Sequence, residues 1–353
     1  MTREAAVAYA LERTVPEPAG ALTRREDEVA RALTKCKLSC ARPVPIPFTR
    51  GDAHMQAVVM HETGGPDVLR LEEAERPEPG DGQVLVRIRA ASVNAIDWKY
   101  RRGFVDKQLP AVLGNEISGT VELSRAEGFG EGDEVFGFAA SGGYAEYAIA
   151  SAAAIVKKPA GVGHEQAAAI PVAGLTAWQA VFDRARLERG QTALIAGAAG
   201  GVGHLAVQFA KFAGGRAIGI GSSRNRDFVL GLGAKEYVDY TQQDVAAAVS
   251  GVDFAFDAVG GETTQSLVPT LREGGLLVTI ANAPPEEAAR ERGTRAELLV
   301  MSPSTEQLGR IAQLVADGAV RVEIADVIPL AEVGRAHELS ESGHTRGKIV
   351  LAT

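Results

Sequence analysis

A glycine-rich turn carries the clearest chemistry in the sequence. It reads Gly197-Ala198-Ala199-Gly200-Gly201-Val202-Gly203, after the strand-like run TALIAG and before an amphipathic stretch, Val202 to Ala213. Small residues let the backbone turn tightly and approach a pyrophosphate, whose charge the amino terminus of the next helix stabilises. Strand, turn and helix in this order are the context that a dinucleotide site requires. The predicted cofactor contacts here are Gly197, Ala199, Gly200, Gly201, Val202 and Gly203.

The end of the next strand distinguishes NAD from NADP. An NAD site places Asp or Glu about 20 residues after the glycine turn, where the carboxylate binds the ribose hydroxyls. Here the run RAIGIG leads into Ser222-Ser223-Arg224-Asn225-Arg226, which contains no acid. Hydroxyls and guanidinium groups suit a 2′-phosphate, because arginine pairs with phosphate through two hydrogen bonds. We therefore predict NADPH as the cofactor, bound at this point by Ser222, Ser223 and Arg224.

Alternating strand and helix patterns position these residues. From about Leu175 the apolar runs RAIGIG, EYVDY, VDFAFDAVG, GGLLVTI and AELLVM alternate with helical stretches, which predicts a doubly wound parallel sheet. Such sheets bind ligands at the carboxyl ends of their strands, so the cofactor contacts are extended by Val259, Gly260, Ile280 and Ala281. In the helix Val202 to Ala213, apolar residues form one face, and His204, Gln208 and Lys211 form the other.

The region before the sheet is predicted to be mostly β. From Met55 onward, MQAVVM, QVLVRIRAASVN, GTVEL, GDEVFGF and GGYAEYAIA are short strand patterns separated by glycine turns, typical of a small, twisted or barrel-like sheet. We predict four segments: an N-terminal extension (1–54), a β domain (55–173), a dinucleotide-binding domain (174–324) and a C-terminal segment (325–353). The extension contains one helical patch, Leu22 to Leu33, between prolines, and we expect it to be weakly ordered.

Length and composition exclude several classes of protein. A chain of 353 residues predicts two domains, and 46% hydrophobic with 23% charged residues excludes a disordered or fibrous chain. A net charge of −8 gives no basic footprint for nucleic acid or for an anionic membrane. The only cysteines, Cys36 and Cys40, exclude a disulfide framework and a four-cysteine zinc lobe. Without a signal peptide or a bilayer-length apolar run, we expect a cytoplasmic protein.

Several segments, taken in order, resemble the medium-chain dehydrogenase/reductase superfamily, and more closely its zinc-independent quinone oxidoreductase branch. They are HETGGPDVLRLEE, ASVNAIDWKYRRG, LPAVLGNEISGTVE, GDEVFGF, GGYAEYA, IPVAGLTAWQA, GAAGGVG and TRGKIVL, and they span residues 55–353. The resemblance implies a GroES-like catalytic domain packed against a Rossmann domain, with the active site between them. It also implies that residues 325–353 return to the catalytic domain.

The sequence departs from the zinc-dependent members at the metal ligands. Zinc alcohol dehydrogenases hold catalytic zinc through Cys, His and a third ligand. Asn94 stands where the cysteine would fall, and Asn115 replaces the histidine in Gly114-Asn115-Glu116. None of the six histidines forms an i,i+4 pair: His54, His61, His164, His204, His337 and His344. We therefore predict no metal, and without a Lewis acid alcohol oxidation is not expected.

The resemblance also implies site residues. Asn94 lies near the nicotinamide, where its amide orients the ring or binds a carbonyl; the alternative is a turn amide. Lys99 matches the lysine of enone reductases that is a candidate to polarise the substrate carbonyl, and a surface lysine is the alternative. Asp97 is a catalytic candidate for which a structural role is the alternative. The proton donor stays open between water and a side chain.

Three further residues match cofactor positions of the family. Thr176 matches a threonine that lines the cofactor site, with a helix-interior hydroxyl as the alternative. Tyr240 matches a position beside the adenine ribose. Lys348, in the run RGK, matches a basic position near the active site, and a surface charge on a strand is the alternative.

The resemblance implies an NADPH-dependent reductase of small-molecule quinones or α,β-unsaturated carbonyl compounds. Such acceptors are already electrophilic, so positioning and modest electrostatic help suffice without a metal. An enoyl-thioester reductase and a non-catalytic NADPH-binding protein are the alternatives, because fold alone does not determine function. Relatives often form dimers, so a homodimer is a further expectation.

Overall fold

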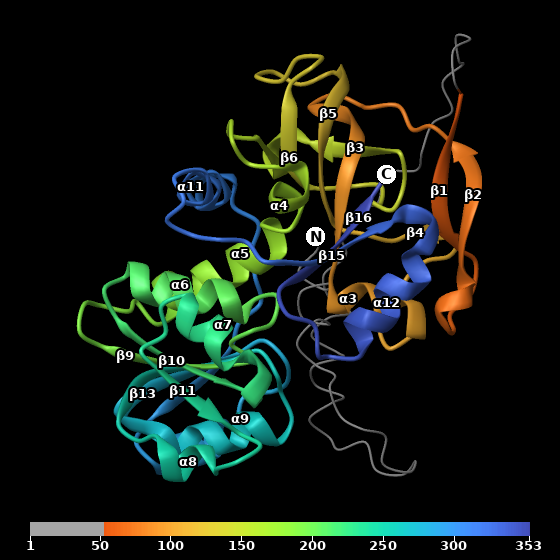
Figure 1. Cartoon of the computed structure of the whole chain (residues 1–353). Coiled ribbons are helices and arrows are strands. Elements are labelled where there is room, and N and C mark those ends of the chain that lie inside the picture. Colours follow the sequence, from red (N-terminus) through yellow and green to blue (C-terminus); the bar gives the residue numbers. More distant parts are fainter. Residues whose placement is uncertain (1–52) are drawn as a thin grey trace.

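The computed structural model describes residues 53–353 and contains a parallel sheet below a mostly antiparallel β region (Figure 1). The parallel sheet has the strand order β11-β10-β9-β12-β13-β14. Its strands are β9 (Thr192–Ala196), β10 (Arg216–Gly221), β11 (Glu236–Asp239), β12 (Val252–Asp257), β13 (Leu271–Thr279) and β14 (Arg295–Leu298). The order reverses between β9 and β12, which is where a doubly wound sheet binds its ligand. The predicted Rossmann sheet is confirmed.

Helices cover both faces of this sheet, and the reason lies in the alternation of side chains along each strand. Ala193 and Ile195 of β9 pack with α5, α6, α7 and α11, whereas Leu194 and Ala196 pack with α8, α9 and α10. Because both faces are buried, the strands are continuous apolar runs. The helices of the described chain are α3 (Ala95–Arg102), α4 (His164–Ala168), α5 (Pro171–Trp178), α6 (Gly203–Phe212), α7 (Arg226–Gly231), α8 (Val245–Ala248), α9 (Glu262–Leu267), α10 (Glu286–Glu291), α11 (Thr305–Ala316) and α12 (Val333–Glu341).

The amphipathic pattern of α6 suggests that its polar face is exposed to solvent, but most of that face is buried. His204 and Gln208 are buried, and only Lys211 is exposed. Gln208 exchanges two hydrogen bonds with the backbone of Arg321, and the Glu323 amide donates to His204 Nε2 over 3.1 Å. These backbone groups lie just before β15, outside any strand, so polar side chains must satisfy them.

The β region contains a seven-stranded sheet in the order β15-β16-β3-β5-β6-β8, with β7 pairing to β3. Its strands are β3 (Gln83–Val93), β5 (Glu116–Ser124), β6 (Glu134–Phe138), β7 (Tyr147–Ser151), β8 (Ile155–Lys157), β15 (Ile324–Pro329) and β16 (Lys348–Ala352). A smaller sheet holds β1 (His54–Met60), β2 (Leu69–Glu75) and β4 (Ala111–Val112). Strand β16 runs antiparallel to β3, with Ile349 opposite Val93, so the C-terminal residues lie inside the β region.

Strand β1 begins one residue earlier than the apolar pattern indicates. His54 pairs with Glu75, and the Ala53 carbonyl accepts a hydrogen bond from the Arg76 amide. Backbone pairing does not require an apolar side chain, which explains the difference from the predicted start at Met55. The helical patch Leu22 to Leu33 and both cysteines lie outside the described residues.

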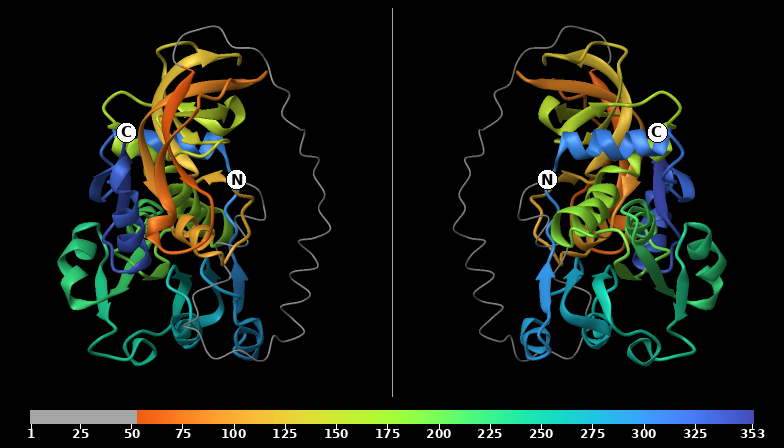
Figure 2. Two further views of the ribbon diagram at one scale, coloured as in Figure 1. Left: turned by 90° about the vertical axis from the view of Figure 1, so that its right-hand side faces the viewer. Right: turned by 90° about the vertical axis from the view of Figure 1, so that its left-hand side faces the viewer.

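One hydrophobic core continues from the β region into the parallel sheet. It includes Phe136 and Phe138 of β6, Phe254 and Phe256 of β12, and five residues of α5: Val172, Ala173, Leu175, Ala177 and Trp178. The boundary predicted between residues 173 and 174 falls inside α5, whose residues are all buried. In Figure 2 the orange and yellow strands lie directly above the green and cyan ones, with α5 between them. Among residues 53–353, no helix has both the length and the apolar character to cross a bilayer.

Candidate active site

Three buried polar residues meet at one edge of the seven-stranded sheet. Asn94 follows the end of β3, while Glu116 and Lys348 are the first residues of β5 and β16. Because β3 is antiparallel to both neighbours, these three positions lie at the same edge. Lys348 Nζ lies 2.6 Å from Asn94 Oδ1 and 3.0 Å from Glu116 Oε1, and Asn94 Nδ2 donates to Glu116 Oε1 over 2.8 Å. We refer to Asn94, Glu116 and Lys348 as the polar triad.

The polar triad is almost completely buried and is connected to the shared core. Asn94 and Lys348 are each 5% exposed and Glu116 is fully buried. Glu116 Oε2 accepts a hydrogen bond of 2.6 Å from the Val172 amide in the first turn of α5. A carboxylate at this end of a helix also interacts favourably with the helix dipole. The triad therefore joins both β5 and β16 to the helix that links the two sheets.

Asp97 lies in the first turn of α3, and its side chain helps to cap that end of the helix. Its Oδ2 accepts hydrogen bonds from the Asn94 amide (2.8 Å) and from the Tyr144 hydroxyl (2.9 Å). Burial raises the pKa of Asp97 to about 6, although both hydrogen bonds favour the charged form. Burial and the neighbouring Asp97 also raise the pKa of Tyr144, which therefore stays protonated and donates. Asp97 was a catalytic candidate with a structural role as the alternative, and these contacts are the ones that a structural role requires.

Lys99 and Thr176 lie inside the protein. The Lys99 side chain is 2% exposed, which excludes the surface alternative, and its Nζ lies 5.9 Å from the centre of the Trp98 ring. The Thr176 hydroxyl donates to the Val172 carbonyl over 2.6 Å within α5. This hydrogen bond is the one expected of a hydroxyl inside a helix, which was the alternative to a cofactor contact, because it already uses the hydroxyl hydrogen.

The glycine turn packs directly against the start of β16. A Cβ on Gly203 would lie 2.1 Å from the Gly197 carbonyl oxygen, so only glycine fits there. A Cβ on Gly201 would lie 3.0 Å from Lys348 Cδ, and the Gly347 amide donates to the Ala199 carbonyl over 2.9 Å. The turn predicted to bind pyrophosphate and the polar triad are therefore adjacent, although they belong to different sheets.

The loop predicted to bind the 2′-phosphate follows β10. Tyr237 donates through its hydroxyl to the Ser222 carbonyl over 2.7 Å, and the Arg224 guanidinium donates to the His344 carbonyl over 3.0 Å. Tyr240 is 56% exposed, and its amide donates to the Gly221 carbonyl over 3.3 Å. Ser222, Ser223, Arg224 and Tyr240 therefore surround the carboxyl end of β10.

Asp257, at the end of β12, is a site residue that the sequence analysis did not identify. Its buried carboxylate accepts hydrogen bonds from the Val259 and Gly260 amides and from the hydroxyls of Thr264 and Thr279. It fixes the turn that presents two of the predicted cofactor contacts. It could have been recognised in the sequence as the acidic residue that directly follows the apolar run VDFAF. Glu116 was also missed, because the GNE motif was used only to exclude zinc.

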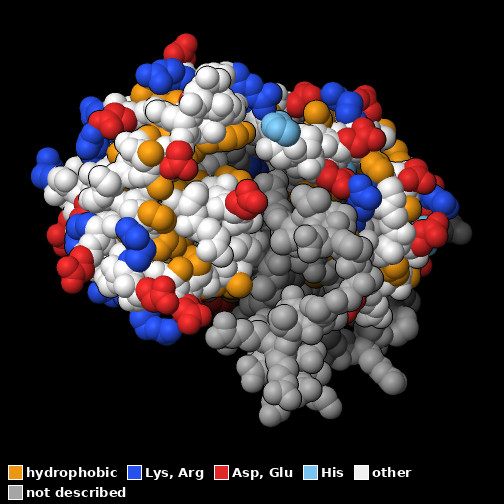
Figure 3. Space-filling model, turned by 90° about the horizontal axis from the view of Figure 1, so that it is seen from below, with side chains coloured by type: hydrophobic (Ala, Val, Ile, Leu, Met, Phe, Trp, Pro, Cys, Tyr) orange, Lys and Arg blue, Asp and Glu red, His pale blue; other side chains and the backbone are white. Residues whose placement is uncertain are grey.

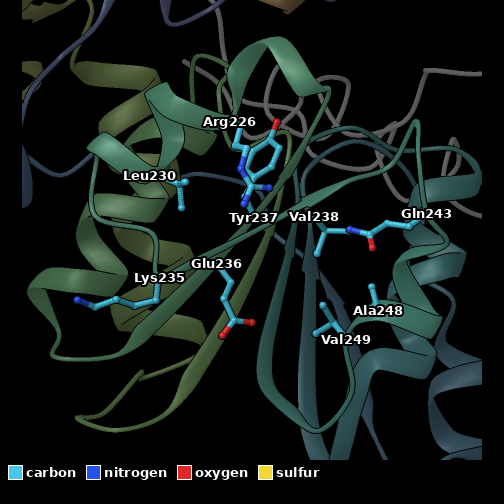
Figure 4. Close-up of a pocket in the computed structure, with 9 residues that line it drawn as sticks. All are labelled: Arg226, Leu230, Lys235, Glu236, Tyr237, Val238, Gln243, Ala248 and Val249. Carbon is cyan, nitrogen blue, oxygen red and sulfur yellow. The ribbon is translucent and has the colours of Figure 1, made fainter.

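A separate hollow lies at the edge of the parallel sheet, beside β11 (Figure 4). It has a volume of about 330 Å³ and is lined by Arg226, Leu230, Lys235, Glu236, Tyr237, Val238, Gln243, Ala248 and Val249. It contains no residue of the glycine turn or the polar triad, so we do not assign it to the active site. On the face shown in Figure 3, basic and acidic side chains are interspersed and form no single basic area.

His337 of α12 is buried behind the site without a hydrogen-bond partner among the described residues. Its ring packs edge-on against Tyr144, with 5.8 Å between the ring centres. Burial, with a smaller effect of the nearby Arg101 charge, lowers the pKa of His337 to about 3. The folded protein therefore holds a neutral imidazole that the unfolded chain would protonate below its ordinary pKa of about 6.5.

We expect this histidine to make the protein acid-sensitive. Between about pH 6.5 and 3 the unfolded chain binds a proton that the folded protein excludes, so stability falls as the pH is lowered. The loss is roughly 1 kcal/mol per pH unit in that range. In His337→Phe the ring packing is kept, and urea titrations from pH 7 to 4.5 should show a shallower decline.

His61→Phe, at an exposed histidine, is the matched control and should follow the unaltered protein. Asp97 acts in the opposite direction, because its raised pKa lets the folded state keep a proton below about pH 6. This contribution is common to all three proteins and cancels in the comparison. Identical pH slopes for His337→Phe and the unaltered protein would contradict the prediction.

Two family profiles match the chain. An alcohol dehydrogenase GroES-like domain matches residues 80–160, and a zinc-binding dehydrogenase domain matches residues 232–351. The first covers β3 to β8, and the second runs from the end of α7 to β16. The polar triad is therefore divided between them, with Asn94 and Glu116 in the first match and Lys348 in the second.

Proteins that resemble the whole described chain include both quinone oxidoreductases and an alcohol dehydrogenase. A chloroplast envelope quinone oxidoreductase homolog of Arabidopsis thaliana is 33% identical over 312 residues, covering 82% of this chain and 95% of the relative. The solved quinone oxidoreductase of Coxiella burnetii has a TM-score of 0.80 at 36% identity, covering 85% of this chain and 99% of that one. An NAD-dependent alcohol dehydrogenase (TM-score 0.80, 30% identity) and a mycobacterial protein complexed with NADPH (TM-score 0.78, 30% identity) each match 85% of this chain over their full length.

Proposed function

Because the chain belongs to the quinone oxidoreductase branch of the medium-chain dehydrogenase/reductase superfamily, we propose that it is an NADPH-dependent, zinc-independent reductase of quinones or α,β-unsaturated carbonyl compounds. The observation that carries the proposal is the contact between the glycine turn and the polar triad. The Gly347–Ala199 hydrogen bond and the packing of Gly201 on Lys348 bring the cofactor loop to Asn94. Bound NADPH would supply a hydride.

The residues of the described chain fit a dinucleotide. The close approach of Gly203 to Gly197 removes side chains from the turn, and α6 begins directly behind it. Ser222, Ser223 and Arg224 would hold the 2′-phosphate, with no carboxylate among them to repel it. The complex of the mycobacterial relative with NADPH supports this choice, whereas the similar alcohol dehydrogenase is NAD-dependent.

The polar triad gives Asn94 a defined orientation. Lys348 Nζ has three hydrogens and three acceptors, which are the Val93 carbonyl, Asn94 Oδ1 and Glu116 Oε1. The lysine thus fixes which end of the Asn94 amide is oxygen, and Glu116 takes one amide hydrogen. The second amide hydrogen is available to a ligand, either the nicotinamide or a substrate carbonyl. Lys348 is in this view a positioning residue.

The residues around the triad do not fit zinc. Zinc in enzymes is bound mainly by cysteine sulfur, histidine nitrogen and carboxylate oxygen. Asn94 offers an amide whose oxygen already binds an ammonium group, and Asn115 replaces the expected histidine. Residues 53–353 contain no cluster of three His, Cys, Asp or Glu side chains that could hold a metal ion. The acceptors that would surround a metal instead surround the Lys348 ammonium group.

Chelation should therefore leave activity unchanged. After exhaustive dialysis against EDTA and 1,10-phenanthroline, we expect quinone reduction at more than about 80% of the starting rate, because no step uses a Lewis acid. Elemental analysis of the purified protein should find far less than one zinc per chain. One zinc per chain, with activity lost on its removal and restored on its return, would overturn the zinc-independent reading.

Steady-state kinetics with a panel of acceptors tests the proposed function itself. NADPH and NADH should each be offered with a quinone, an enone, an enoyl thioester and a simple ketone. Oxidation of NADPH by the quinone or the enone supports the proposal. Turnover of the thioester alone would make the protein an enoyl-thioester reductase, and tight NADPH binding without turnover of any acceptor would make it a binding protein. Light scattering on the same sample tests the expected homodimer.

A further inference from the structure

The segment His344–Lys348 touches three parts of the proposed cofactor site within five residues. The His344 carbonyl accepts from Arg224, the Gly347 amide donates to the Ala199 carbonyl of the glycine turn, and Lys348 joins the polar triad. These contacts place one short stretch of chain beside the 2′-phosphate loop, the pyrophosphate turn and Asn94. Arg346 lies in the middle of this segment and is not used by the proposed function.

The Arg346 guanidinium binds two residues of the 2′-phosphate loop, Arg224 and Asn225. Its Nη2 donates to the Arg224 carbonyl over 2.9 Å, and both Nε and Nη2 lie 3.2 Å from Asn225 Oδ1. The guanidinium also stacks on the Phe228 ring, 5.0 Å from its centre. Planar guanidinium groups make such forked contacts, which a lysine cannot reproduce. The loop also binds the C-terminal segment in return, because the Arg224 guanidinium donates to the His344 carbonyl.

These contacts matter because the loop is otherwise held mainly at its start. Tyr237 holds the Ser222 carbonyl, whereas Arg224 and Asn225 are held by Arg346. A loop that must be ordered when a ligand binds weakens affinity by the entropy it loses, and a loop held in advance does not. In the described chain no carboxylate forms an ion pair with Arg224, Arg226 or Arg346, so their charge remains available to an anion.

We propose that Arg346 is a positioning residue for the 2′-phosphate of NADPH: it holds Arg224 and Asn225 against the C-terminal segment and thereby sets the cofactor preference. This inference rests on the proposed function. Arg346 acts through the loop backbone and the Asn225 side chain, by its hydrogen bonds to the Arg224 carbonyl and to Asn225 Oδ1. Its removal should weaken binding of NADPH and leave binding of NADH unchanged.

The test is a direct measurement of binding, without a substrate. By calorimetry, Arg346→Met should raise the Kd for NADPH by about 5- to 10-fold, the size of one or two lost hydrogen bonds, with the Kd for NADH within about twofold. Asn225→Ala removes the acceptor and should have a similar effect. Because Arg346→Met already removes the contact that Asn225→Ala removes, the double variant should bind NADPH little more weakly than Arg346→Met alone. Arg335→Met, an exposed arginine of α12 paired with Asp326, is the charge-matched control and should bind as the unaltered protein does.

Arg346→Lys distinguishes the forked hydrogen bonds to the loop from the effect of a positive charge at this position. It keeps the charge and loses the forked hydrogen bonds, so we expect an NADPH Kd close to that of Arg346→Met. An unaltered NADPH Kd in both Arg346→Lys and Asn225→Ala would show that Arg346 acts as a charge and would overturn the inference. An unaltered ratio of the two Kd values in Arg346→Met, in a protein that prefers NADPH, would overturn the inference alone. Equal affinity of the unaltered protein for NADPH and NADH would instead overturn the cofactor assignment on which it rests.

Discussion

Replacement of Lys348 by methionine is expected to lower the free energy of unfolding by about 3–5 kcal/mol. Methionine fills a similar volume but removes the cation from a site that is 5% exposed, leaving the buried Glu116 carboxylate without its counter-charge. Asn94 Oδ1 and the Val93 carbonyl lose their donor in the same change. Urea unfolding monitored by circular dichroism measures the effect.

A double variant distinguishes charge from packing. In Lys348→Met/Glu116→Gln the uncompensated charge is gone, so much of the stability should return. Lys157→Met removes the same side chain from an exposed pair with Asp133 and should cost at most about 1 kcal/mol. A loss in Lys348→Met no larger than in Lys157→Met would mean that the buried ion pair of the triad does not stabilise the fold.

The cofactor preference should respond to the arginines of the β10 loop. With Ser222, Ser223 and Arg224 in place, we expect catalytic efficiency with NADPH to exceed that with NADH by at least about tenfold. A charge-assisted bidentate contact contributes about 1.5–3 kcal/mol, or roughly 10- to 150-fold in affinity. Arg224→Ala should erode the preference through the Michaelis constant for NADPH, with NADH turnover nearly unchanged.

Arg226 lies two residues further on and can share the contact, so Arg224→Ala/Arg226→Ala is the stronger variant. It should bring the two efficiencies to within a few-fold of each other. Arg272→Ala, on an exposed pair with Asp253 on β12, controls for the loss of positive charge on the same sheet. An unchanged preference in the double variant would require the 2′-phosphate to be held elsewhere.

Local patterns predicted those parts of the molecule that depend on local spacing. The strand runs, the glycine turn and the helix behind it follow from residue type and periodicity, because Gly203 tolerates no side chain whatever surrounds the turn. The alternation of strands and helices predicted the parallel sheet, but the reversal of strand order between β9 and β12 comes from the structure. The replacement of the expected cysteine and histidine ligands by Asn94 and Asn115 could also be read from the sequence.

Contacts between distant residues could not be predicted in the same way. Lys348 reaches Asn94 across 254 positions, and Arg346 reaches Arg224 across 122. The first contact depends on the register of β16 against β3, which no periodicity within either strand specifies. The second depends on how the loop after β10 packs against the segment before β16. The polar face of α6 is buried rather than solvent-facing for the same reason. The backbone groups that hydrogen-bond to His204 and Gln208 lie more than 100 positions away in the sequence.

The pairing of β16 with β3 has a consequence for biosynthesis. Val93 and Lys348 are separated by 255 positions, so β3 leaves the ribosome long before the strand that pairs with it has been translated. During that interval β7 covers Gln83–Arg87 on this side of β3, but the Ala90–Val93 half has no partner, and the carboxylate of Glu116 has no counter-ion. Exposed strand edges of this kind promote association between chains. The nascent polypeptide is therefore expected to need protection by chaperones until translation has passed Lys348, and only then can the site for the nicotinamide form.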